Sequence, residues 1–398
     1  MFLFSKNLGS AVIIAGTSIG AGMLAIPATM APCGFWISCL LLIAIWFLML
    51  VTGLLLAEVN ISMENGSNFS RMAYITLGKP GYFITWFGYL FLLYSLTAAY
   101  TVGGGNLIEH ILSMISIYLP FWLNSLIFII IMGVLVFSGT RTVDHANKIF
   151  LLLKFIAFFG FFLMVLPNIE LNYLNSKVQN PHCVWFSLPI LITSFGFHHV
   201  IPSLRTYVQS NANALKQAII IGSIIPLIVY ILWVLATLGS VSLNSFQDII
   251  LSGDIAKGIA LNYKKSFIKN FVYGFESIAV TTSFLGVTLG LFDFNRDTYG
   301  LRKKSFINKI IISVITFFPP LLFAMYYPNG FKVALGYASI FVAILLIAMP
   351  AAMAWVVRSR KEINHYSSKA LITIIMGLSL LIIGLEIATI SNLFTNVI

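Results

Sequence analysis

Long apolar stretches, separated by short polar loops, run through the whole sequence. Their length is that of membrane-spanning helices, which need about 20 apolar residues, and not that of the short alternating strands of a membrane barrel. The pattern therefore predicts an all-α polytopic membrane protein with a single transmembrane domain over residues 1–398. We expect about eleven helices, near residues 9–30, 36–58, 81–108, 122–138, 146–166, 184–203, 217–240, 267–294, 306–326, 331–356 and 368–392.

Composition excludes an ordinary soluble protein. Of the 398 residues, 59% are hydrophobic and only 9% are charged, whereas a soluble domain carries about a quarter charged residues. The net charge of +11 would suggest nucleic acid as the partner of a soluble protein. Here the basic residues lie in short loops, where they set orientation and meet anionic lipid headgroups. We therefore expect the lipid bilayer as a partner and no nucleic acid; the oligomeric state stays open.

The loop charges predict the orientation of the chain. One set of alternate loops, together with the N-terminus, holds most of the Lys and Arg residues, among them Arg71, Arg141, Arg205 and Arg358. Because the richer set faces the cytoplasm, the N-terminus is expected inside and, with eleven helices, the C-terminus outside. An N-terminal signal peptide is the alternative for residues 1–21, but the many further spans favour an uncleaved first helix. The other set of loops holds only Lys177, Lys257, Lys264, Lys265, Lys269 and Lys332.

The first apolar run contains an unusual glycine-rich stretch, Gly16-Thr17-Ser18-Ile19-Gly20-Ala21-Gly22. Three glycines in seven residues disfavour a continuous helix, since each costs about 1 kcal/mol relative to alanine. Irregular backbone survives in a bilayer only where it lines a cavity or a site. We interpret the stretch as a break between two half-helices. The alternative is a close-packing motif, because Gly16 and Gly20 also have GxxxG spacing.

The sixth run is interrupted in the same way. Within residues 188–202, Gly196 and the pair His198-His199 lie at the centre, and Pro189 and Pro202 flank them. Interrupted spans at corresponding positions of two halves are typical of a transporter binding site. Breaks in the first and sixth spans predict two inverted repeats of five helices, over 9–166 and 184–356, with 368–392 as an additional C-terminal helix.

Backbone groups at the two breaks could bind a zwitterion. The amides of Gly20, Ala21 and Gly22 would begin a half-helix, and helix N-termini favour anions such as a carboxylate. Carbonyl groups near Gly16 and Thr17, and near Ser194 and Phe195, could accept from an ammonium group. An α-amino acid carries both charges, although a small anion would satisfy the amides alone.

The side chains expected around these breaks are aromatic or small, as in many small-molecule sites. With 34 Phe and 16 Tyr in the chain, a packing or lipid-facing role is the alternative for each of them. One histidine of the adjacent pair is a candidate substrate contact or proton carrier, or a structural residue held by a carbonyl. The side-chain candidates are Tyr94, Thr97 and Tyr100 on the third span, Phe195, Phe197 and His198 on the sixth, and Phe284 on the eighth.

Few charged residues lie within the spans, and these are candidates for coupling. Lys154 lies about 12 Å along its helix from the inner membrane edge. Thr281, Thr282 and Ser283 fall at a comparable depth, so an ammonium there could take the place of a sodium ion between the first, fifth and eighth spans. A snorkelling or structural lysine is the alternative. Glu276 is a further coupling candidate, although it could instead face water near the outer end of its span.

Other chemistry has little support. The cysteines Cys33, Cys39 and Cys183 show no metal-ligand spacing and are interpreted as packing residues. Neither a metal site nor a cofactor is expected. Glu58 and Asp293 fall at the cytoplasmic ends of spans, where we expect caps or loop ion pairs.

Three stretches resemble the bacterial aromatic amino acid permeases, and most of all their tyrosine-specific members. They are residues 15–27 in the first span, residues 193–198 and 201–204 in the sixth, and residues 282–294 in the eighth; residues 94–100 of the third span also fit. The resemblance implies a LeuT-type fold, a location in the bacterial inner membrane and proton-coupled uptake of tyrosine or tryptophan. His199 and Glu276 depart from the family pattern, which leaves the choice of substrate and the coupling open.

The sequence therefore predicts a secondary transporter, a proton symporter for aromatic L-amino acids that works by alternating access. A sodium-coupled permease, or a serine or threonine permease, of the same fold is the first alternative. An integral-membrane transferase is a distant one, because such enzymes need charged loop residues that this chain lacks. A channel would require a repeated pore-lining element, and none is visible.

Overall fold

A computed structural model of the protein describes residues 6–176, 178, 180, 182–241, 266–301, 305–361 and 369–395, and all regular structure in these residues is helical. Among them, 9 helical segments are long and apolar enough to cross a membrane, and two shorter apolar helices span Leu8–Ser18 and Ala370–Leu385. The prediction of a polytopic helical membrane protein is confirmed at this level. The predicted basic loop residues Lys177, Lys257, Lys264 and Lys265 lie outside the described residues.

The first half of the chain contains one interrupted helix followed by four longer ones. Their bounds are α1 (Lys6–Ser18), η1 (Ala21–Ala25), α2 (Ile26–Met30), η2 (Ala31–Cys33), α3 (Gly34–Ile61), α4 (Phe69–Ser113), α5 (Phe121–Ser138) and α6 (Thr140–Val165).

The second half begins with short elements and a second interrupted helix. Its elements are η3 (Leu166–Asn168), α7 (Leu171–Leu174), α8 (Cys183–Ser194), η4 (His198–Val200), α9 (Ile201–Tyr207), α10 (Ala212–Leu238), α13 (Ser266–Thr298), α14 (Phe306–Tyr326), α15 (Phe331–Val342), the π-helix η5 (Ala343–Ala348), α16 (Met349–Lys361) and α17 (Lys369–Thr395).

Local sequence signals explain several helix boundaries. Asn68 accepts a hydrogen bond from the Arg71 amide at the start of α4, and Asn211 does the same for Ala214 at the start of α10, as expected of asparagine at an N-cap. Gly78, with φ of 71° inside α4, marks a kink two residues before Pro80. A short helix of residues 69–77 therefore precedes the membrane-spanning part of α4.

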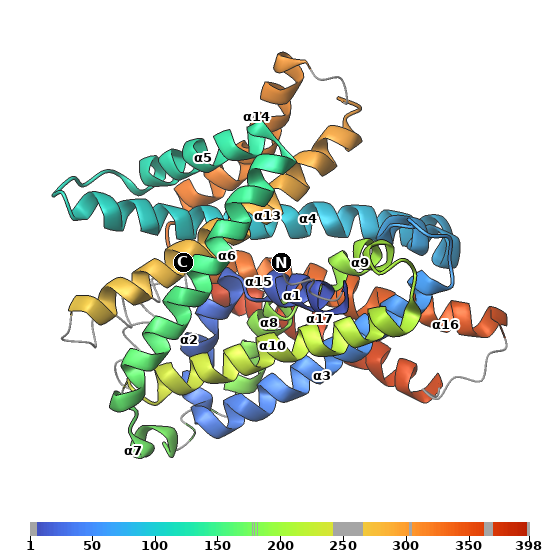
Figure 1. Ribbon diagram of the computed structural model, residues 1–398, viewed down its shortest axis with the longest axis horizontal. Helices are drawn as coiled ribbons and strands as arrows, with labels where there is room; N and C mark the ends of the chain where they lie inside the picture. The colour runs from blue at the N-terminus through green and yellow to red at the C-terminus, as the bar shows by residue number, and fades with distance from the viewer. Residues whose placement is uncertain are drawn as a thin grey trace.

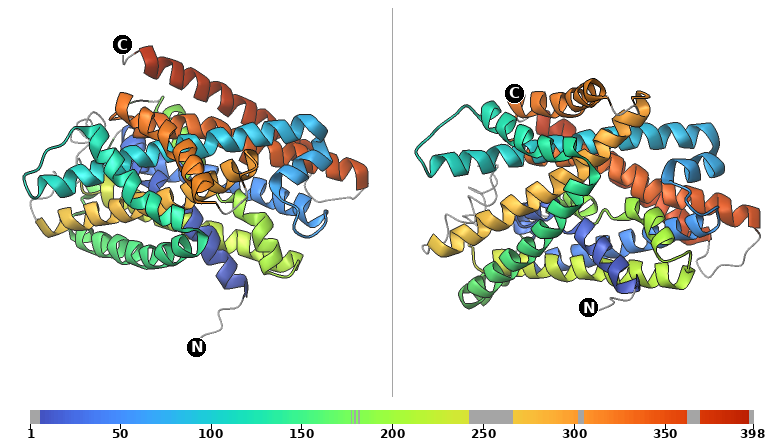
Figure 2. Two further views of the ribbon diagram at one scale, coloured as in Figure 1. Left: turned by 90° about the horizontal axis from the view of Figure 1, so that it is seen from above. Right: turned by 45° about the horizontal axis from the view of Figure 1, so that its top comes forward.

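The interrupted helices lie in the middle of the bundle. α1 packs along α10, while α8 contacts α2, η1 and α15; Figure 1 shows α1, α8 and α15 between the α4 layer and the α3–α10 pair. α6 packs along α13, and α15 along α4. α1 and α17 lie on opposite sides of the bundle in the left view of Figure 2. Many large apolar side chains, such as Leu40 (67% exposed) and Leu380 (70% exposed), face outwards, as expected where lipid covers the protein.

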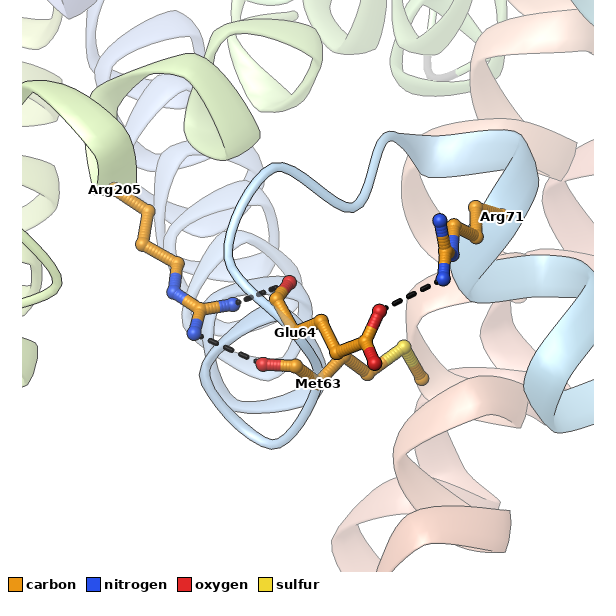
Figure 3. A network of polar contacts seen from close by, with 4 residues as sticks. All are labelled: Met63, Glu64, Arg71 and Arg205. Atoms are coloured by element: carbon orange, nitrogen blue, oxygen red, sulfur yellow. Dashed lines mark hydrogen bonds and ion pairs between the residues drawn. The ribbon is translucent and has the colours of Figure 1, made fainter.

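A buried arginine fixes one end of the bundle. Arg205 on α9 is 7% exposed and donates to the carbonyl oxygens of Asn60, Met63 (2.9 Å) and Glu64 (3.3 Å), where α3 ends. Figure 3 shows the contacts of Arg205 with Met63 and Glu64, and the Glu64 carboxylate beside Arg71, with which it pairs at 2.8 Å. A cation is favourable at the C-terminus of a helix. The sequence alone indicates only that Arg205 is one of the basic loop residues.

Glu58 and Asp293, expected as caps or in loop ion pairs, both form ion pairs, but these lie between or within helices. Glu58 pairs with Arg358 on α16, with N–O distances of 2.6 Å and 2.8 Å. Asp293 pairs with Arg296 at 3.0 Å within α13.

A disulfide joins the other ends of the two interrupted helices, and it corrects one prediction. Cys33, at the end of η2, is bonded to Cys183, at the start of α8, with 5.6 Å between their Cα atoms. The interpretation of both residues as packing cysteines is therefore wrong; Cys39 is the free cysteine among the described residues. The bond spans 150 residues of sequence, so no short motif announces it.

Candidate functional site

The first helix is broken close to the predicted position, but over a shorter stretch. α1 continues through Gly16 and Thr17 to Ser18, and the chain resumes as η1 at Ala21. Gly20, the residue before η1, has extended backbone angles of φ −122° and ψ −166°. Gly16 lies against Leu151 of α6, and the Thr17 hydroxyl donates to the Ile13 carbonyl at 2.7 Å. The break itself is therefore Ile19–Gly20, with Gly16 and Thr17 in the last turn of α1.

The sixth span is broken as predicted. α8 ends at Ser194, three residues follow, and η4 begins at His198. Pro189 lies inside α8, and Pro202 lies in the first turn of α9, where proline needs no amide partner. Gly196 lies between the two half-helices, and an added Cβ there would lie 3.1 Å from the Thr193 carbonyl oxygen.

The two breaks meet. A Cβ on Gly22 would lie 2.9 Å from the Ser194 hydroxyl oxygen, so glycine permits this close approach. The fully buried Tyr230 of α10 has its hydroxyl 2.6 Å from the Ser18 carbonyl oxygen and 2.8 Å from that of Ser194. These are the last residues of α1 and α8, so one side chain reaches the C-terminal ends of both helices.

Side chains from three other helices bind consecutive backbone groups of the first break. Tyr230 of α10 contacts the Ser18 carbonyl, and the Lys154 ammonium of α6 donates to the Ile19 carbonyl at 2.5 Å. The Ala21 amide donates to the Ser283 hydroxyl of α13 at 2.9 Å. Backbone groups freed by a break inside a membrane need such partners. The Gly20 amide is bonded within the break, to the Ser18 carbonyl at 2.7 Å.

Lys154 is buried, with 2% of its surface exposed. Besides the Ile19 carbonyl, its Nζ reaches the Thr282 hydroxyl of α13 at 3.5 Å. Ser283, the next residue, contacts the first break through Ala21 and also hydrogen-bonds Tyr100 of α4. The structure therefore brings together three of the coupling candidates, Lys154, Thr282 and Ser283, at the first break.

Glu276, a further coupling candidate, lies away from the first break. It is half-buried and lines a cavity of about 10 Å³ between α4 and α13, together with His110 and Tyr273, whose rings stack with centroids 3.7 Å apart. That volume corresponds to about one water molecule. Because Glu276 precedes Thr282 by six residues, it is about 9 Å further along the helix.

The aromatic candidates divide into two groups. Phe195 and Phe197 are buried at the second break; the Phe195 ring packs edge-on against Tyr230 at 4.9 Å, and Phe197 lies against Gly53 of α3. Phe284 instead packs between Phe128 of α5 and Phe317 of α14.

Two of the three predicted third-span residues, Tyr94 and Thr97, show no hydrogen bond to either break. The Tyr94 hydroxyl donates to the Ile315 carbonyl of α14 at 2.8 Å. The buried Thr97 hydroxyl donates to the Leu93 carbonyl one turn earlier. Tyr100, the remaining third-span candidate, hydrogen-bonds Ser283 next to the first break. Tyr230 also reaches that break, and the sequence did not single it out because no motif surrounds it.

The two adjacent histidines face different ways. His198 is fully buried and its Nε2 lies 2.9 Å from the Thr52 hydroxyl of α3, whereas His199 is exposed. The Thr52 hydroxyl lies within 3.2 Å of the carbonyls of Leu48 and Met49, to which it can donate while accepting from His198. His198 Nδ1 is buried and has no hydrogen-bond partner among the residues that the structure describes.

A larger cavity lies away from the breaks. It has a volume of about 670 Å³ and is lined by residues of α4 and of the end of α13, among them Arg71, Tyr74, Trp86 and Asp297. None of its lining residues belongs to either break. The breaks themselves are closed, because Ser18, Ser194, Phe195 and His198 are all buried.

Comparison with known proteins shows the family of the chain. The tryptophan/tyrosine permease family matches residues 4–390. "Tyrosine-specific transport system 2" of Haemophilus influenzae is 36% identical over 366 residues, which cover 90% of this chain and 89% of that protein. The "Tryptophan-specific transport protein" of the same organism is 34% identical, over 87% of this chain and 86% of that protein. "Glutamine transporter 2" of Aliivibrio fischeri is 31% identical, over 89% of this chain and 90% of that protein.

These relatives are transport proteins and not enzymes. The similarity extends through both broken helices and is not confined to one motif. With the family match over nearly the whole sequence, the chain belongs to the tryptophan/tyrosine permease family.

Proposed function

We propose that this permease imports tyrosine or tryptophan across the bacterial inner membrane together with a proton. The observation that carries the proposal is that two broken helices meet in the middle of the bundle. The Tyr230 hydroxyl lies within hydrogen-bond distance of the last carbonyl oxygen of each of them. Irregular backbone at that depth is retained where it serves a ligand. Family membership and the names of the two Haemophilus relatives support an aromatic amino acid as that ligand.

The charged groups of an amino acid match the two ends of the breaks. The amides of Gly20, Ala21 and Gly22 lie where η1 begins, a position that favours a carboxylate. The Ala21 amide is bonded to the Ser283 hydroxyl, which a carboxylate could replace as the stronger acceptor. The carbonyl ends of α1 and α8 favour the ammonium group.

The buried residues of the second break support an apolar place for the aromatic ring. Phe195, Gly196 and Phe197 lie between α8 and η4 and carry no charge. His198 Nδ1 is a buried polar atom beside them. It is the group in the second break best suited to a phenol hydroxyl or an indole N–H, the donors that tyrosine and tryptophan carry.

Lys154 is the group proposed to couple the proton. Its ammonium joins the Ile19 carbonyl of the first break to Thr282 of α13, the place at which a sodium ion would otherwise be expected. A lysine that loses its proton there also loses one donor to these oxygen atoms. Release of the proton would therefore loosen α1 from α6 and α13, which is how the gradient can drive opening.

We also propose a LeuT-type arrangement, with two inverted repeats of five helices, an additional eleventh helix, a cytoplasmic N-terminus and a periplasmic C-terminus. The positions of the breaks support the repeats. The Cys33–Cys183 bond supports the orientation independently of the loop charges, because disulfides persist in the periplasm and not in the cytoplasm. Arg205 and Arg358 lie at the ends of helices that this orientation makes cytoplasmic.

The test is uptake of labelled tyrosine by purified protein in liposomes with an imposed proton gradient. We expect accumulation that a protonophore abolishes and that a sodium gradient does not replace. Unlabelled tyrosine and tryptophan should compete, whereas glutamine, serine and leucine should not. Accumulation without a proton gradient would contradict the coupling, and competition by glutamine alone would contradict the aromatic substrate.

A further inference from the structure

The environment of the Tyr230 hydroxyl contains more acceptors than it can satisfy. Its oxygen lies 2.6 Å from the Ser18 carbonyl oxygen and 2.8 Å from the Ser194 carbonyl oxygen. A tyrosine hydroxyl has one proton. It can therefore donate to only one of these carbonyls at a time. When it donates to Ser194, the Ser18 carbonyl still accepts from the Gly20 amide at 2.7 Å and keeps a second lone pair that the phenol does not serve.

Both carbonyls carry more negative charge than an isolated peptide group. Ser18 is the last residue of α1, and Ser194 is the last residue of α8. A helix C-terminus carries roughly half a negative charge, so two such ends converge on one buried hydroxyl. The group that best complements this arrangement is a cation with several N–H donors.

The rest of the Tyr230 side chain is held in place. The residue is fully buried, and its ring packs edge-on against Phe195 with centroids 4.9 Å apart. α10 packs along α1. The hydroxyl therefore occupies a fixed point between the two breaks and does not depend on a mobile side chain.

We propose that Tyr230 is the residue that makes this permease specific for a primary α-ammonium group. Its hydroxyl holds the carbonyls of Ser18 and Ser194 at one point and donates to one of them. The substrate ammonium donates to the other carbonyl and to the phenol oxygen, whose lone pairs are free to accept. This inference rests on the proposed function, because it assigns one part of the same site.

The arrangement predicts which substrates bind. A primary ammonium has three N–H donors, enough for the carbonyl that Tyr230 does not serve and for the phenol oxygen together. A ligand with the same ring and carboxylate but no amine cannot serve either oxygen. Tyr230 should therefore contribute to the affinity for L-tyrosine and not to the affinity for 3-(4-hydroxyphenyl)propionate, its deaminated analogue.

The experiment is equilibrium binding of these two ligands to purified wild type and to Tyr230→Phe. In wild type we expect clear preference for tyrosine. In Tyr230→Phe the dissociation constant for tyrosine should rise about tenfold, the effect of one hydrogen bond to a charged group, while that of the analogue stays the same. Tyr94→Phe is the matched control, because it removes a hydroxyl that also donates to a carbonyl at 2.8 Å, on α14; its preference ratio should equal that of wild type.

The outcomes separate this inference from the proposed function. Tyr230→Phe could weaken the binding of both ligands equally or leave both dissociation constants unchanged. Either result would show a purely structural residue and overturn the inference. Failure of wild type to bind tyrosine would overturn the proposed function instead. Where Tyr230→Phe does not fold, wild type with N,N-dimethyltyrosine serves: its single N–H should cost about tenfold in affinity, and binding equal to that of tyrosine overturns the inference.

Discussion

Gly22 shows most clearly that there is no space for a larger side chain where the two breaks meet. Its position for a Cβ lies 2.9 Å from the Ser194 hydroxyl oxygen and 3.5 Å from the Ser194 Cα. We predict that Gly22→Val lowers tyrosine uptake at least about fivefold, since overpacking costs about 1–3 kcal/mol, without loss of protein from the membrane. Uptake and membrane content are measured together. Gly286→Ala is the control, because nothing lies within 4 Å of its Cβ position; normal uptake by Gly22→Val would count against the site.

Lys154 allows a separate test at the same scale. We predict that Lys154→Ala impairs proton-driven accumulation of tyrosine more than it impairs tyrosine–tyrosine exchange. The ammonium bound to the Ile19 carbonyl is lost, so opening no longer depends on a proton, while the carbonyls and amides that hold the substrate remain. Both rates are measured in the same liposomes. Lys309→Ala is the control, because Lys309 also donates to a carbonyl, that of Phe137 at 3.3 Å, but on α14. Equal loss of accumulation and exchange would reject the proton role.

At the scale of elements, sequence patterns predicted the broken helices and missed the contacts that hold them. Glycine and proline act locally, so the breaks near Gly20 and Gly196 could be read directly from the chain. Tyr230 is one of 16 tyrosines, and only the packing of α10 along α1 brings its hydroxyl to Ser18 and Ser194. Phe284, in contrast, lies in the eighth-span motif, but the motif does not indicate that its ring packs against α5 and α14 and not at the breaks.

At the same scale, the Cys33–Cys183 disulfide links the two interrupted helices. It ties η2, which follows the first break, to α8, which precedes the second. We predict that denatured protein exposes one thiol to a maleimide reagent, that of Cys39, and that all three cysteines react after reduction. The mass increase on a gel measures this. Three reactive thiols before reduction would contradict the bond.

Loss of the disulfide should also lower the thermal stability of the protein. The double variant Cys33→Ser/Cys183→Ser is expected to unfold at a lower temperature than wild type, because the bond no longer restricts the unfolded chain. Cys39→Ser, which changes the free cysteine, should unfold close to the wild-type temperature. If the double variant unfolds at the same temperature as wild type, packing alone holds η2 against α8.

Across the whole molecule, the interrupted sixth span is fixed at both of its ends. At one end the Cys33–Cys183 bond holds α8; at the other Arg205 on α9 binds the carbonyls at the end of α3. The first link is covalent, whereas the second consists of hydrogen bonds that can break and re-form. The proposed alternating access, in the proposed orientation, requires the cytoplasmic half-helices to separate from their neighbours. The Arg205 contacts are therefore the ones that we expect to break when the site opens inwards.

Removal of Arg205 should favour the inward-open state. In Arg205→Ala the end of α3 loses a buried donor to three carbonyls, and α9, which contacts α1, is no longer held. We predict that a cysteine placed at Thr17, in the last turn of α1, reacts about tenfold faster from the cytoplasmic side in this background, which corresponds to a shift of about 1.4 kcal/mol. The rate is measured with a membrane-impermeant maleimide on inside-out vesicles, in protein that also carries Cys39→Ser.

The control lies in the same network. Arg71→Ala removes the neighbouring ion pair with Glu64, whose side chains are 59% and 80% exposed; exposed pairs contribute at most about 1 kcal/mol, and Arg71 does not contact α9 in Figure 3. The cysteine at Thr17 should therefore react at the wild-type rate in Arg71→Ala. Arg205→Lys should lie between wild type and Arg205→Ala, because one ammonium cannot reproduce the planar donors of a guanidinium. Equal rates in Arg205→Ala and Arg71→Ala would show that opening does not depend on the contact between α9 and α3.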